Sequence, residues 1–509
     1  MLAKTYSYGI QGLEAFLVTI EVDVSRGLPC LTIVGLPDTA IKESKERVRS
    51  AIRNSGFKLK PQRVTVNLSP ADVKKEGPCF DLAIAIGMLA ASGHILLANL
   101  DKFALLGELS LDSDIKPVRG SLSVALSMRN SSFEGLILPF NNLAEAAIVE
   151  NPPIYPVKTL NDVVHLLSNP GDIKPANAGL PKKTEIKPYD VDFAEVKGQN
   201  HVKRGLEIAA SGMHNVLLIG PPGSGKSMLA KRFPTILPDM NFDEVLEISK
   251  IHSVLGYLKP TEGLMHNRPF RSPHHTTSDV ALVGGGTYPK PGEITLSHHG
   301  VLFLDELPEF NRNVLEALRQ PLEDHCVTIA RANKTLQFPA RTVLLAAMNP
   351  CPCGWFSDTK RECHCNPLQI QRYLSKISGP LLDRIDLHLE VPSLPSQELL
   401  STTTAENSQT IKERTTQAWG IQKERFKNTA ILSNAHMNHR QIKQYCALNT
   451  ESKKLLKLAI EELQLSARAY DKILKVSRTI ADLVGSIPIE TEHLAEAIQY
   501  RSLDRNWFK

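Results

Sequence analysis

One short stretch constrains the fold of this chain more than any other. The apolar run Val216–Ile219 is typical of a buried strand, and Met228–Arg232 is typical of a helix. The loop between them fits the pattern G-x-x-x-x-G-K-[ST] and consists of Gly220, Pro221, Pro222, Gly223, Ser224, Gly225, Lys226 and Ser227. A chance match rarely has strand, loop and helix in this order, so the stretch predicts a phosphate-binding P-loop.

The residue types of this loop suit a nucleoside triphosphate and Mg²⁺. Glycines let backbone N–H groups converge on phosphate oxygens, and the helix start adds the positive end of its dipole. Lys226 can reach the β- and γ-phosphates, and Ser227 can ligate Mg²⁺. The loop therefore predicts ATP and Mg²⁺ as cofactors.

Two further apolar runs end in polar residues that could act on the same phosphates. Val301–Leu304 is followed by Asp305 and Glu306, and Thr342–Ala347 is followed closely by Asn349. Asp305 would hold Mg²⁺ through water, Glu306 would polarise the attacking water, and Asn349 would contact that water or the γ-phosphate. Taken alone, these would be solvated strand ends and a turn residue. Downstream of a P-loop, we expect them to be catalytic.

Arginines further along the chain could stabilise charge on a transferred phosphoryl group. Arg384 lies in a short acidic turn, where it is either a paired surface residue or an arginine finger acting on a neighbouring subunit's ATP. Its place after the other motifs favours the finger. Arg468 begins a helix predicted from Ser466, and Arg478 follows on the same helix. We favour Arg468 for catalysis, with a solvated helix arginine as the alternative.

Composition is that of a globular protein in water. The 509 residues suffice for two to four domains, and the formal charge of +5 does not by itself indicate a nucleic-acid partner. The longest apolar run, Leu82–Ala91, is too short to cross a bilayer, and Glu14 and Glu21 interrupt any signal-peptide pattern. Eight cysteines in so long a chain do not indicate a secreted disulfide framework. We expect a cytoplasmic protein with no membrane partner.

Hydrophobic patterning divides the chain into four segments. Residues 1–168 mix strands and helices, and residues 169–190 are a Pro- and Lys-rich linker without an apolar period. Residues 191–395 alternate short strands with helices, as in a parallel α/β sheet, and residues 396–509 are mostly helical. In the first segment the patterns predict strands at Val18–Val24, Leu31–Val34 and Val64–Leu68 and helices at Ala40–Asn54 and Leu82–Ala91.

Four of the cysteines cluster shortly after the third strand. They are Cys351, Cys353, Cys363 and Cys365. Four thiols this close in a cytoplasmic protein are typical of a tetrahedral Zn²⁺ site, although the C-x-C spacing is less common than C-x2-C. His364 could replace one thiol, and free or redox-active thiols are the alternative.

A basic β-hairpin is predicted over Val327–Phe338. Its turn near Asn333 places Arg331 and Lys334 at the tip. A solvated hairpin would explain this charge, but in a ring of subunits such tips would form a basic collar able to follow a phosphate backbone. The hairpin is therefore a candidate DNA contact.

Together these motifs resemble the ComM/YifB family of magnesium-chelatase-like AAA+ ATPases. The resemblance runs end to end and is carried by Ile33–Asp38, Phe270–Ser278, Gly284–Gly286, Asn349–Gly354 and Leu381–Asp386. It implies an AAA+ P-loop α/β core with a C-terminal helical lid, assembled as a homo-hexamer with ATP sites between subunits. It also implies a helicase that promotes branch migration of single-stranded and branched DNA in natural transformation, alongside recombinase and other recombination proteins.

The N-terminal segment resembles the Lon protease domain, a ribosomal S5 domain 2-type fold. Cys79 stands at the position of the Lon serine, in the turn Gly77–Asp81, and Leu122 stands at the position of the Lon lysine. The resemblance therefore implies a ChlI-type domain without a catalytic dyad, acting as a scaffold or binding DNA.

Two other classes of function remain open at this point. A magnesium-chelatase-like ATPase would remodel a protein partner, and that machine needs a metal-binding partner domain that this chain lacks. An ATP-dependent protease is opposed by the missing lysine. The effect of single-stranded DNA on ATP turnover would separate a DNA motor from a protein remodeller.

Overall fold

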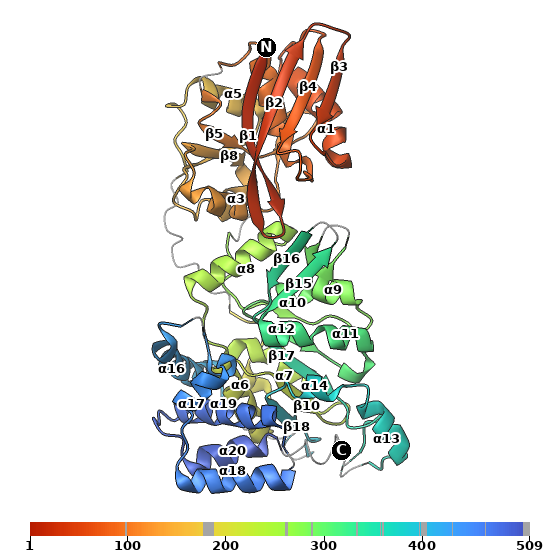
Figure 1. Cartoon of the computed structure of the whole chain (residues 1–509), viewed down its shortest axis with the longest axis vertical. Helices are drawn as coiled ribbons and strands as arrows, with labels where there is room; N and C mark the ends of the chain where they lie inside the picture. The colour runs from red at the N-terminus through yellow and green to blue at the C-terminus, as the bar shows by residue number, and fades with distance from the viewer. Residues whose placement is uncertain are drawn as a thin grey trace. The chain divides into compact units, whose positions relative to one another are not determined.

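The computed structural model describes residues 1–96, 99–176, 188–259, 263–286, 289–331, 334–356, 358, 361–395, 398, 405–429, 431–463 and 465–501. The chain divides into two compact units (Figure 1). The N-terminal unit comprises Met1–Glu185 with Phe242–His266, and the ATPase unit comprises Ile186–Asn241 with Asn267–Lys509.

A seven-stranded sheet forms the centre of the N-terminal unit, in the order β3-β4-β2-β1-β5-β8-β9. Its strands are β1 (Leu2–Gln11), β2 (Glu14–Ser25), β3 (Cys30–Val34), β4 (Arg63–Ser69), β5 (Phe103–Leu105), β8 (Gly135–Pro139) and β9 (Ile154–Val157). β2 pairs antiparallel with β1 and β4, whereas the other pairs are parallel. A two-stranded ribbon is added by β6 (Glu108–Leu109) and β7 (Ile115–Lys116).

Helices cover this sheet. They are α1 (Thr39–Asn54), α2 (Asp81–Ala91), α3 (Ser121–Ser127), α4 (Leu143–Ala146) and α5 (Leu160–Ser168). Every residue of α2 is buried, as expected for a helix that is apolar on all sides. The Thr5 hydroxyl of β1 donates to the Ala83 carbonyl of α2 at 3.0 Å, which ties the helix to the middle of the sheet.

One segment from the middle of the chain belongs to the N-terminal unit. Helix α8 (Phe242–Leu255) follows the P-loop region in sequence, yet Lys250 Nζ lies 2.6 Å from Glu14 Oε1. The Gly120 backbone N–H donates to the Ser253 carbonyl at 3.0 Å. The chain therefore leaves the ATPase unit after Asn241 and returns to it at Asn267.

The ATPase unit contains a five-stranded parallel sheet in the order β11-β14-β17-β10-β18. Its strands are β10 (Val216–Ile219), β11 (Phe270–Arg271), β14 (Val301–Leu304), β17 (Val343–Met348) and β18 (Leu387–Glu390). Antiparallel pairs outside this sheet are β12 (Gly284–Gly285) with β13 (Lys290–Pro291), and β15 (Cys326–Arg331) with β16 (Lys334–Pro339). Because β17 lies between β10 and β14, the loops after these three strands meet at one edge.

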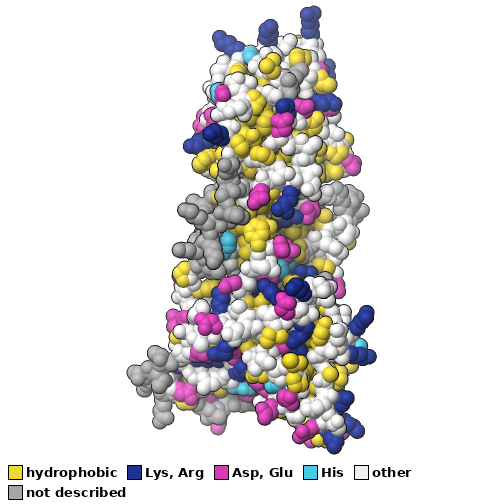
Figure 2. Space-filling model, turned by 90° about the vertical axis from the view of Figure 1, so that its left-hand side faces the viewer, with side chains coloured by type: hydrophobic (Ala, Val, Ile, Leu, Met, Phe, Trp, Pro, Cys, Tyr) yellow, Lys and Arg dark blue, Asp and Glu magenta, His cyan; other side chains and the backbone are white. Residues whose placement is uncertain are grey.

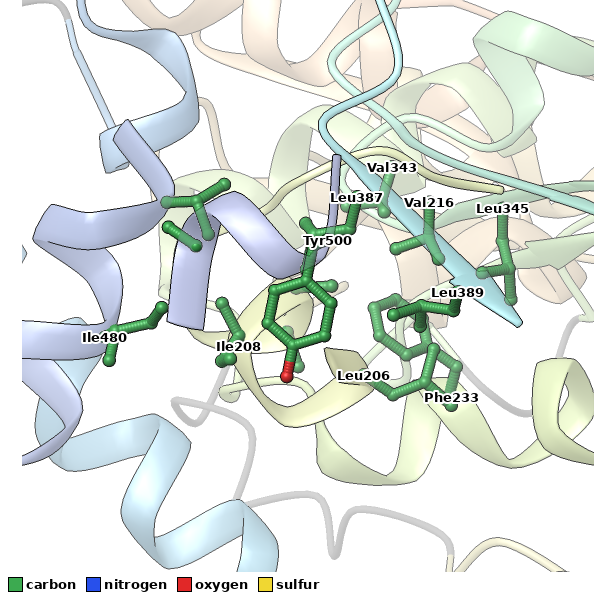
Figure 3. Close-up of a cluster of buried hydrophobic side chains, with 14 of the residues drawn as sticks. Leu206, Ile208, Val216, Phe233, Val343, Leu345, Leu387, Leu389, Ile480 and Tyr500 are labelled. Atoms are coloured by element: carbon green, nitrogen blue, oxygen red, sulfur yellow. The ribbon is translucent and has the colours of Figure 1, made fainter. Parts of the chain in front are cut away.

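Helices surround this sheet and continue into a helical lid. Around the sheet lie α6 (Asn200–Gly212), α7 (Lys226–Arg232), α9 (Asp279–Val283), α10 (Glu293–Leu296), α11 (Arg312–Ala317), α12 (Arg319–Asp324), α13 (Pro367–Leu374) and α14 (Gly379–Leu382). The lid consists of α16 (Ser408–Phe426), α17 (His439–Tyr445), α18 (Thr450–Leu463), α19 (Ala467–Leu483) and α20 (Thr491–Gln499). Figure 3 shows Ile480 and Tyr500 of the lid region beside Ile208 of α6, so the lid shares the core of the sheet.

The structure confirms the α/β class, the parallel sheet and the helical C-terminal region. All predicted strands and helices of the first segment are present, with ends that differ by up to four residues. Half of the predicted linker, residues 177–187, lies outside the described residues. None of the helices described is both long and apolar enough to span a lipid bilayer.

Candidate functional site

The P-loop follows β10 at the carboxyl edge of the parallel sheet. The loops after β10, β14 and β17 at this edge are here called the nucleotide edge. Gly223 and Gly225 have φ angles of 76° and 95°, in the left-handed region that glycine adopts without strain. The Gln199 side-chain amide donates to the Ser224 carbonyl at 2.7 Å and braces the loop from the start of α6. The eight residues Gly220–Ser227 thus form a loop whose curvature depends on its glycines, as the sequence pattern predicts.

Lys226 connects the P-loop to the end of β17. Its ammonium donates to the carbonyls of Gly220 at 2.6 Å and Pro221 at 2.9 Å, and to Asn349 Oδ1 at 3.1 Å. Burial lowers the pKa of Lys226 to about 8, although Asp305 and Glu306 act in the opposite direction. Asn349 therefore lies where it can share a phosphate ligand with Lys226.

Ser227 and Asp305 are in direct contact. The Ser227 hydroxyl donates to Asp305 Oδ2 at 2.6 Å, which brings together the first turn of α7 and the end of β14. Hydroxyl and carboxylate oxygens are the ligand types that Mg²⁺ prefers in proteins. The two residues fit the role of magnesium ligands that the sequence predicts for them.

Glu306 adopts an unusual backbone conformation beside a histidine. Its φ of 53° is left-handed, which is uncommon for a residue with a side chain and is often found at functional sites. His275 Nδ1 lies 3.3 Å from Glu306 Oε2, and the Glu306 side chain is 56% exposed. The carboxylate is therefore already open to solvent, and it would have to leave His275 to act on a water beside the P-loop.

Arg384 and Arg468 meet at one carboxylate, that of Glu323 on α12. Arg384 Nη2 lies 2.6 Å from Glu323 Oε2, and Arg468 Nη2 lies 3.3 Å from Glu323 Oε1. Arg384 is largely buried, and its Nε has no hydrogen-bond partner among the described residues. Arg478 is also buried, but it is bound to Asp482 and to backbone carbonyls. Of Arg468 and Arg478, Arg468 is the more exposed, with 53% of its side chain accessible, and it would have to leave Glu323 to reach a phosphate.

The four cysteines after β17 converge as predicted. Cys351 Sγ lies 3.3 Å from Cys353 Sγ and 3.7 Å from Cys363 Sγ, and the Cys353 backbone N–H donates to Cys365 Sγ at 3.4 Å. All four sulfurs lie within 4.8 Å of one another. Four thiolates around one Zn²⁺ at Zn–S bonds of about 2.3 Å have sulfurs about 3.8 Å apart, so the cluster fits this ion.

The cysteine loop packs against the P-loop. Gly354 has a φ of 85°, and a Cβ atom at this position would lie 2.5 Å from Pro222 Cδ, so only glycine permits this approach. Asn349, two residues before Cys351, contacts Lys226. A metal ion that fixes the cysteine loop would therefore also fix two contacts of the nucleotide edge.

Comparisons with known proteins identify the family to which this arrangement belongs. Residues 20–142 match the model for subunit ChlI of Mg-chelatase, residues 192–399 that for magnesium chelatase subunit ChlI, and residues 405–501 that for its C-terminal part. Competence protein ComM of Haemophilus influenzae is 46% identical over 511 residues, which cover 99% of this chain and 98% of that protein. The chain belongs to the ComM/YifB family.

Other members of the ComM/YifB family are similar over the same length. The YifB protein of Escherichia coli is 43% identical over 99% of this chain and 98% of its own length. An uncharacterized protein of Mycobacterium tuberculosis is 36% identical over 98% of both chains. Membership of this magnesium-chelatase-like AAA+ family implies that the chain is an ATPase.

The basic hairpin of this ComM/YifB protein is present. Antiparallel β15 and β16 form it, with Arg331 paired to Lys334 in the register, which confirms the predicted hairpin. Residues 332–333 and the side chains of Arg331 and Lys334 lie outside what the structure describes. Their contact with DNA stays a prediction.

The N-terminal unit lacks the surroundings that a nucleophilic cysteine needs. Burial raises the pKa of Cys79 to about 12, with the nearby carboxylate of Asp81 acting in the same direction. Leu122 is fully buried on α3. A thiol held protonated at neutral pH is a poor nucleophile, which agrees with the predicted loss of the dyad.

Several site residues of this ComM/YifB protein escaped the sequence patterns. Gln199 and Glu323 are single polar residues outside recognisable motifs, whereas His275 lies in the family motif Phe270–Ser278 without a role that the sequence assigns to it. Each of the three contacts a partner distant in sequence.

Proposed function

We propose that this protein is an ATP-driven DNA motor, a helicase that promotes branch migration during homologous recombination in natural transformation. One observation carries the proposal: Ser227 bonded to Asp305 and Lys226 bonded to Asn349, in a chain 46% identical to a competence protein. The site supports ATP hydrolysis, and the relative's name points to the process that uses it. On this proposal the protein works in the cytoplasm alongside a recombinase.

Each polar residue of the nucleotide edge would have a defined role in ATP hydrolysis. Lys226 would exchange its contacts with the carbonyls of Gly220 and Pro221 for phosphate oxygens. Bound Mg²⁺, held by Ser227 and Asp305, would neutralise charge on the β- and γ-phosphates. Glu306 would leave His275 and accept a proton from the attacking water, which Asn349 would orient.

A homo-hexamer would complete the site. Arg384 and Arg468 are held together by Glu323, and we propose that both stabilise charge on the γ-phosphate bound by a neighbouring subunit. The test mixes Arg384→Ala subunits with Lys226→Ala subunits, each inactive alone. Recovered turnover in mixed rings supports action between subunits, whereas no recovery at any mixing ratio contradicts it.

The substrate is tested by ATP turnover with and without DNA. We expect single-stranded DNA and four-way junctions to stimulate hydrolysis, and Arg331→Ala with Lys334→Ala to weaken DNA binding through lost phosphate contacts. Turnover that is indifferent to both DNAs would remove the proposal. The same experiment tests the second candidate, a magnesium-chelatase-like ATPase that remodels a protein partner, which the three ChlI family models favour. That candidate predicts stimulation by a protein and not by DNA.

Two finer assignments accompany this function. We propose that the cluster of Cys351, Cys353, Cys363 and Cys365 binds one Zn²⁺ that stiffens the loop beside the P-loop. We also propose that the N-terminal unit has a Lon-protease-like fold without protease activity, supported by the raised pKa of the half-buried Cys79 and by Leu122 at the lysine position.

A further inference from the structure

One end of the seven-stranded sheet of the N-terminal unit presents a group of exposed cations. In the sheet register, both Ser25 at the end of β2 and Cys30 at the start of β3 pair with Arg63. The β2–β3 turn and the connection from α1 to β4 therefore emerge together at this end. The exposed cations there, here called the basic end, are Arg26, Lys58, Lys60 and Arg63.

The connection that carries two of these cations is anchored to the core. Phe57 and Leu59 pack against the hydrophobic core of the unit, whereas Lys58 and Lys60 are exposed, which is the alternation of an extended segment. His94 Nε2 lies 3.3 Å from the Lys58 carbonyl oxygen, and the His94 ring meets Phe57 edge-on at 5.7 Å. The two lysines are thus held outward by a braced backbone.

The cations of the basic end are not neutralised by neighbours. No hydrogen bond or ion pair holds the side chains of Arg26, Lys58, Lys60 and Arg63 within the part of the chain that the structure describes. Elsewhere in this unit exposed lysines do pair, as Lys116 does with Asp114 at 3.3 Å.

Sequence composition concentrates positive charge at the same place. Residues 1–168 contain 17 Lys or Arg and 17 Asp or Glu, a balance of zero. Between Glu46 and Asp72, however, there are six Lys or Arg and no acidic residue. Figure 2 shows Lys and Arg side chains projecting at the top of the view, the end of this unit from which the β2–β3 turn emerges. Local charge of one sign, held on a rigid scaffold, attracts a polyanion.

We propose that the basic end binds the phosphate backbone of nucleic acid and gives the motor a second DNA contact on its N-terminal unit. Lys58 and Lys60, two residues apart on extended chain, are about 6.8 Å apart, which is about two steps of phosphate rise along one strand. Leu28, 87% exposed in the adjacent turn, supplies an apolar side chain that can lie against sugars or bases. The proposal rests on the proposed function, because DNA is the polymer that the motor moves.

An anionic membrane surface would attract the same cations, but the structure favours nucleic acid. Attachment to a bilayer normally uses an amphipathic helix that buries a continuous apolar face in the lipid. Here the cations lie on a turn, an extended connection and the start of β4. The exposed apolar side chains near them, Leu28 of the turn and Met1 and Leu2 at the N-terminus, come from separate segments and do not form one helix face. Vesicle binding is therefore the competing outcome of the test.

The experiment uses the full chain with four neutral substitutions, Arg26→Gln, Lys58→Gln, Lys60→Gln and Arg63→Gln. Binding of labelled single-stranded DNA and of a four-way junction is measured by anisotropy over a range of salt concentrations, with a non-hydrolysable ATP analogue present. A matched control removes four exposed cations elsewhere in the same unit, through Lys42→Gln, Lys116→Gln, Arg129→Gln and Lys158→Gln. Melting temperatures establish that both variants are folded.

We expect the basic-end variant to bind at least about tenfold more weakly near 0.1 M salt, with the slope of log affinity against log salt reduced by about 3 for single-stranded DNA. The control variant should bind like the unmodified protein. If the fourfold variant fails to fold, Lys58→Gln with Lys60→Gln alone should reduce the slope by about 1.4.

The outcomes separate this inference from the function on which it rests. If the unmodified protein binds DNA and the basic-end variant binds it with the same affinity and salt slope, the inference is wrong and the proposed motor function stands. If the unmodified protein binds neither single-stranded DNA nor the four-way junction, the proposed DNA motor function is wrong. Loss of binding to phosphatidylserine vesicles with DNA binding unchanged would assign the basic end to a membrane and also overturn the inference.

Discussion

Arg384 and Arg468 are bound to the two oxygens of a single carboxylate, that of Glu323, at 2.6 and 3.3 Å. Arg384 follows α14 beside the sheet, whereas Arg468 begins lid helix α19. One anion thus holds both arginines at the place where the lid meets the sheet. The two proposed catalytic arginines thus share one carboxylate, and we propose that Glu323 positions them.

Glu323→Gln tests this arrangement. The amide keeps the shape of the side chain but loses the charge that holds two guanidinium groups. We therefore expect kcat for ATP to fall by about tenfold, because both arginines are then less firmly positioned. Nucleotide affinity should change by less than about twofold, because Glu323 lies outside the nucleotide edge. Steady-state kinetics and nucleotide titration measure the two quantities.

A double substitution separates positioning from general structural damage. In an Arg468→Ala background, adding Glu323→Gln should lower kcat by a smaller factor than it does in the unmodified protein, since one of the two arginines through which Glu323 acts is already gone. Glu316→Gln, which removes an ion pair with Arg319, is the matched control and should retain turnover. Fully multiplicative losses from Glu323→Gln and Arg468→Ala would contradict the positioning role.

Glu306→Gln should bind ATP and stop before hydrolysis. The amide cannot accept the proton of the attacking water, so turnover should fall by at least about a hundredfold while ATP binding persists. Rings assembled with ATP should therefore be long-lived, which size-exclusion chromatography with light scattering can follow. Glu309→Gln is the control, because Glu309 is bound to exposed Lys376. Substantial turnover in Glu306→Gln would mean that another residue activates the water.

The lowered pKa of Lys226 predicts how the affinity for ATP depends on pH. Burial lowers its pKa to about 8 in the free protein, and a phosphate requires the protonated ammonium. As pH rises through this value the free protein loses the proton, and ATP binding must restore it. Affinity should therefore fall about fivefold between pH 8 and pH 9, with proton uptake on binding. Calorimetry in two buffers of different ionisation enthalpy measures both, and a constant affinity from pH 7 to pH 9 would contradict the expectation.

Metal analysis tests the cysteine cluster independently of activity. We expect about one zinc per chain in purified protein, and none after Cys353→Ser with Cys363→Ser, because two of four thiolate ligands are then lost. The melting temperature should fall, since the loop beside Pro222 loses its cross-link. Cys30→Ser, at an exposed cysteine of the N-terminal unit, should leave the zinc content unchanged. Metal-free protein with all four thiols titratable would remove the site.

The nucleotide edge could be predicted from sequence because each of its parts is local. β10, β14 and β17 are short apolar runs, and the residues that matter follow each run within a few positions. Parallel strands then bring these positions to one edge, so neighbouring sequence signals become neighbouring side chains. The cysteine cluster was predictable for the same reason, since its four thiols lie within one loop.

Contacts that join distant segments left no such signal. β1 was not predicted, because its inward positions hold Thr5 and Ser7 where a typical strand has aliphatic residues. Small hydroxyl side chains fit there because α2 lies close, and Thr5 donates to its Ala83 carbonyl. The grouping of α8 with the N-terminal unit and the Glu323 contacts likewise depend on how separate segments pack.

The most direct test of the central claim is migration of a synthetic four-way DNA junction, followed by fluorescence as its arms separate. We expect the protein to drive separation of the arms with ATP and Mg²⁺, and not with a non-hydrolysable analogue or after Glu306→Gln. Full ATP turnover in the presence of the junction, with no separation of its arms, would contradict the claim.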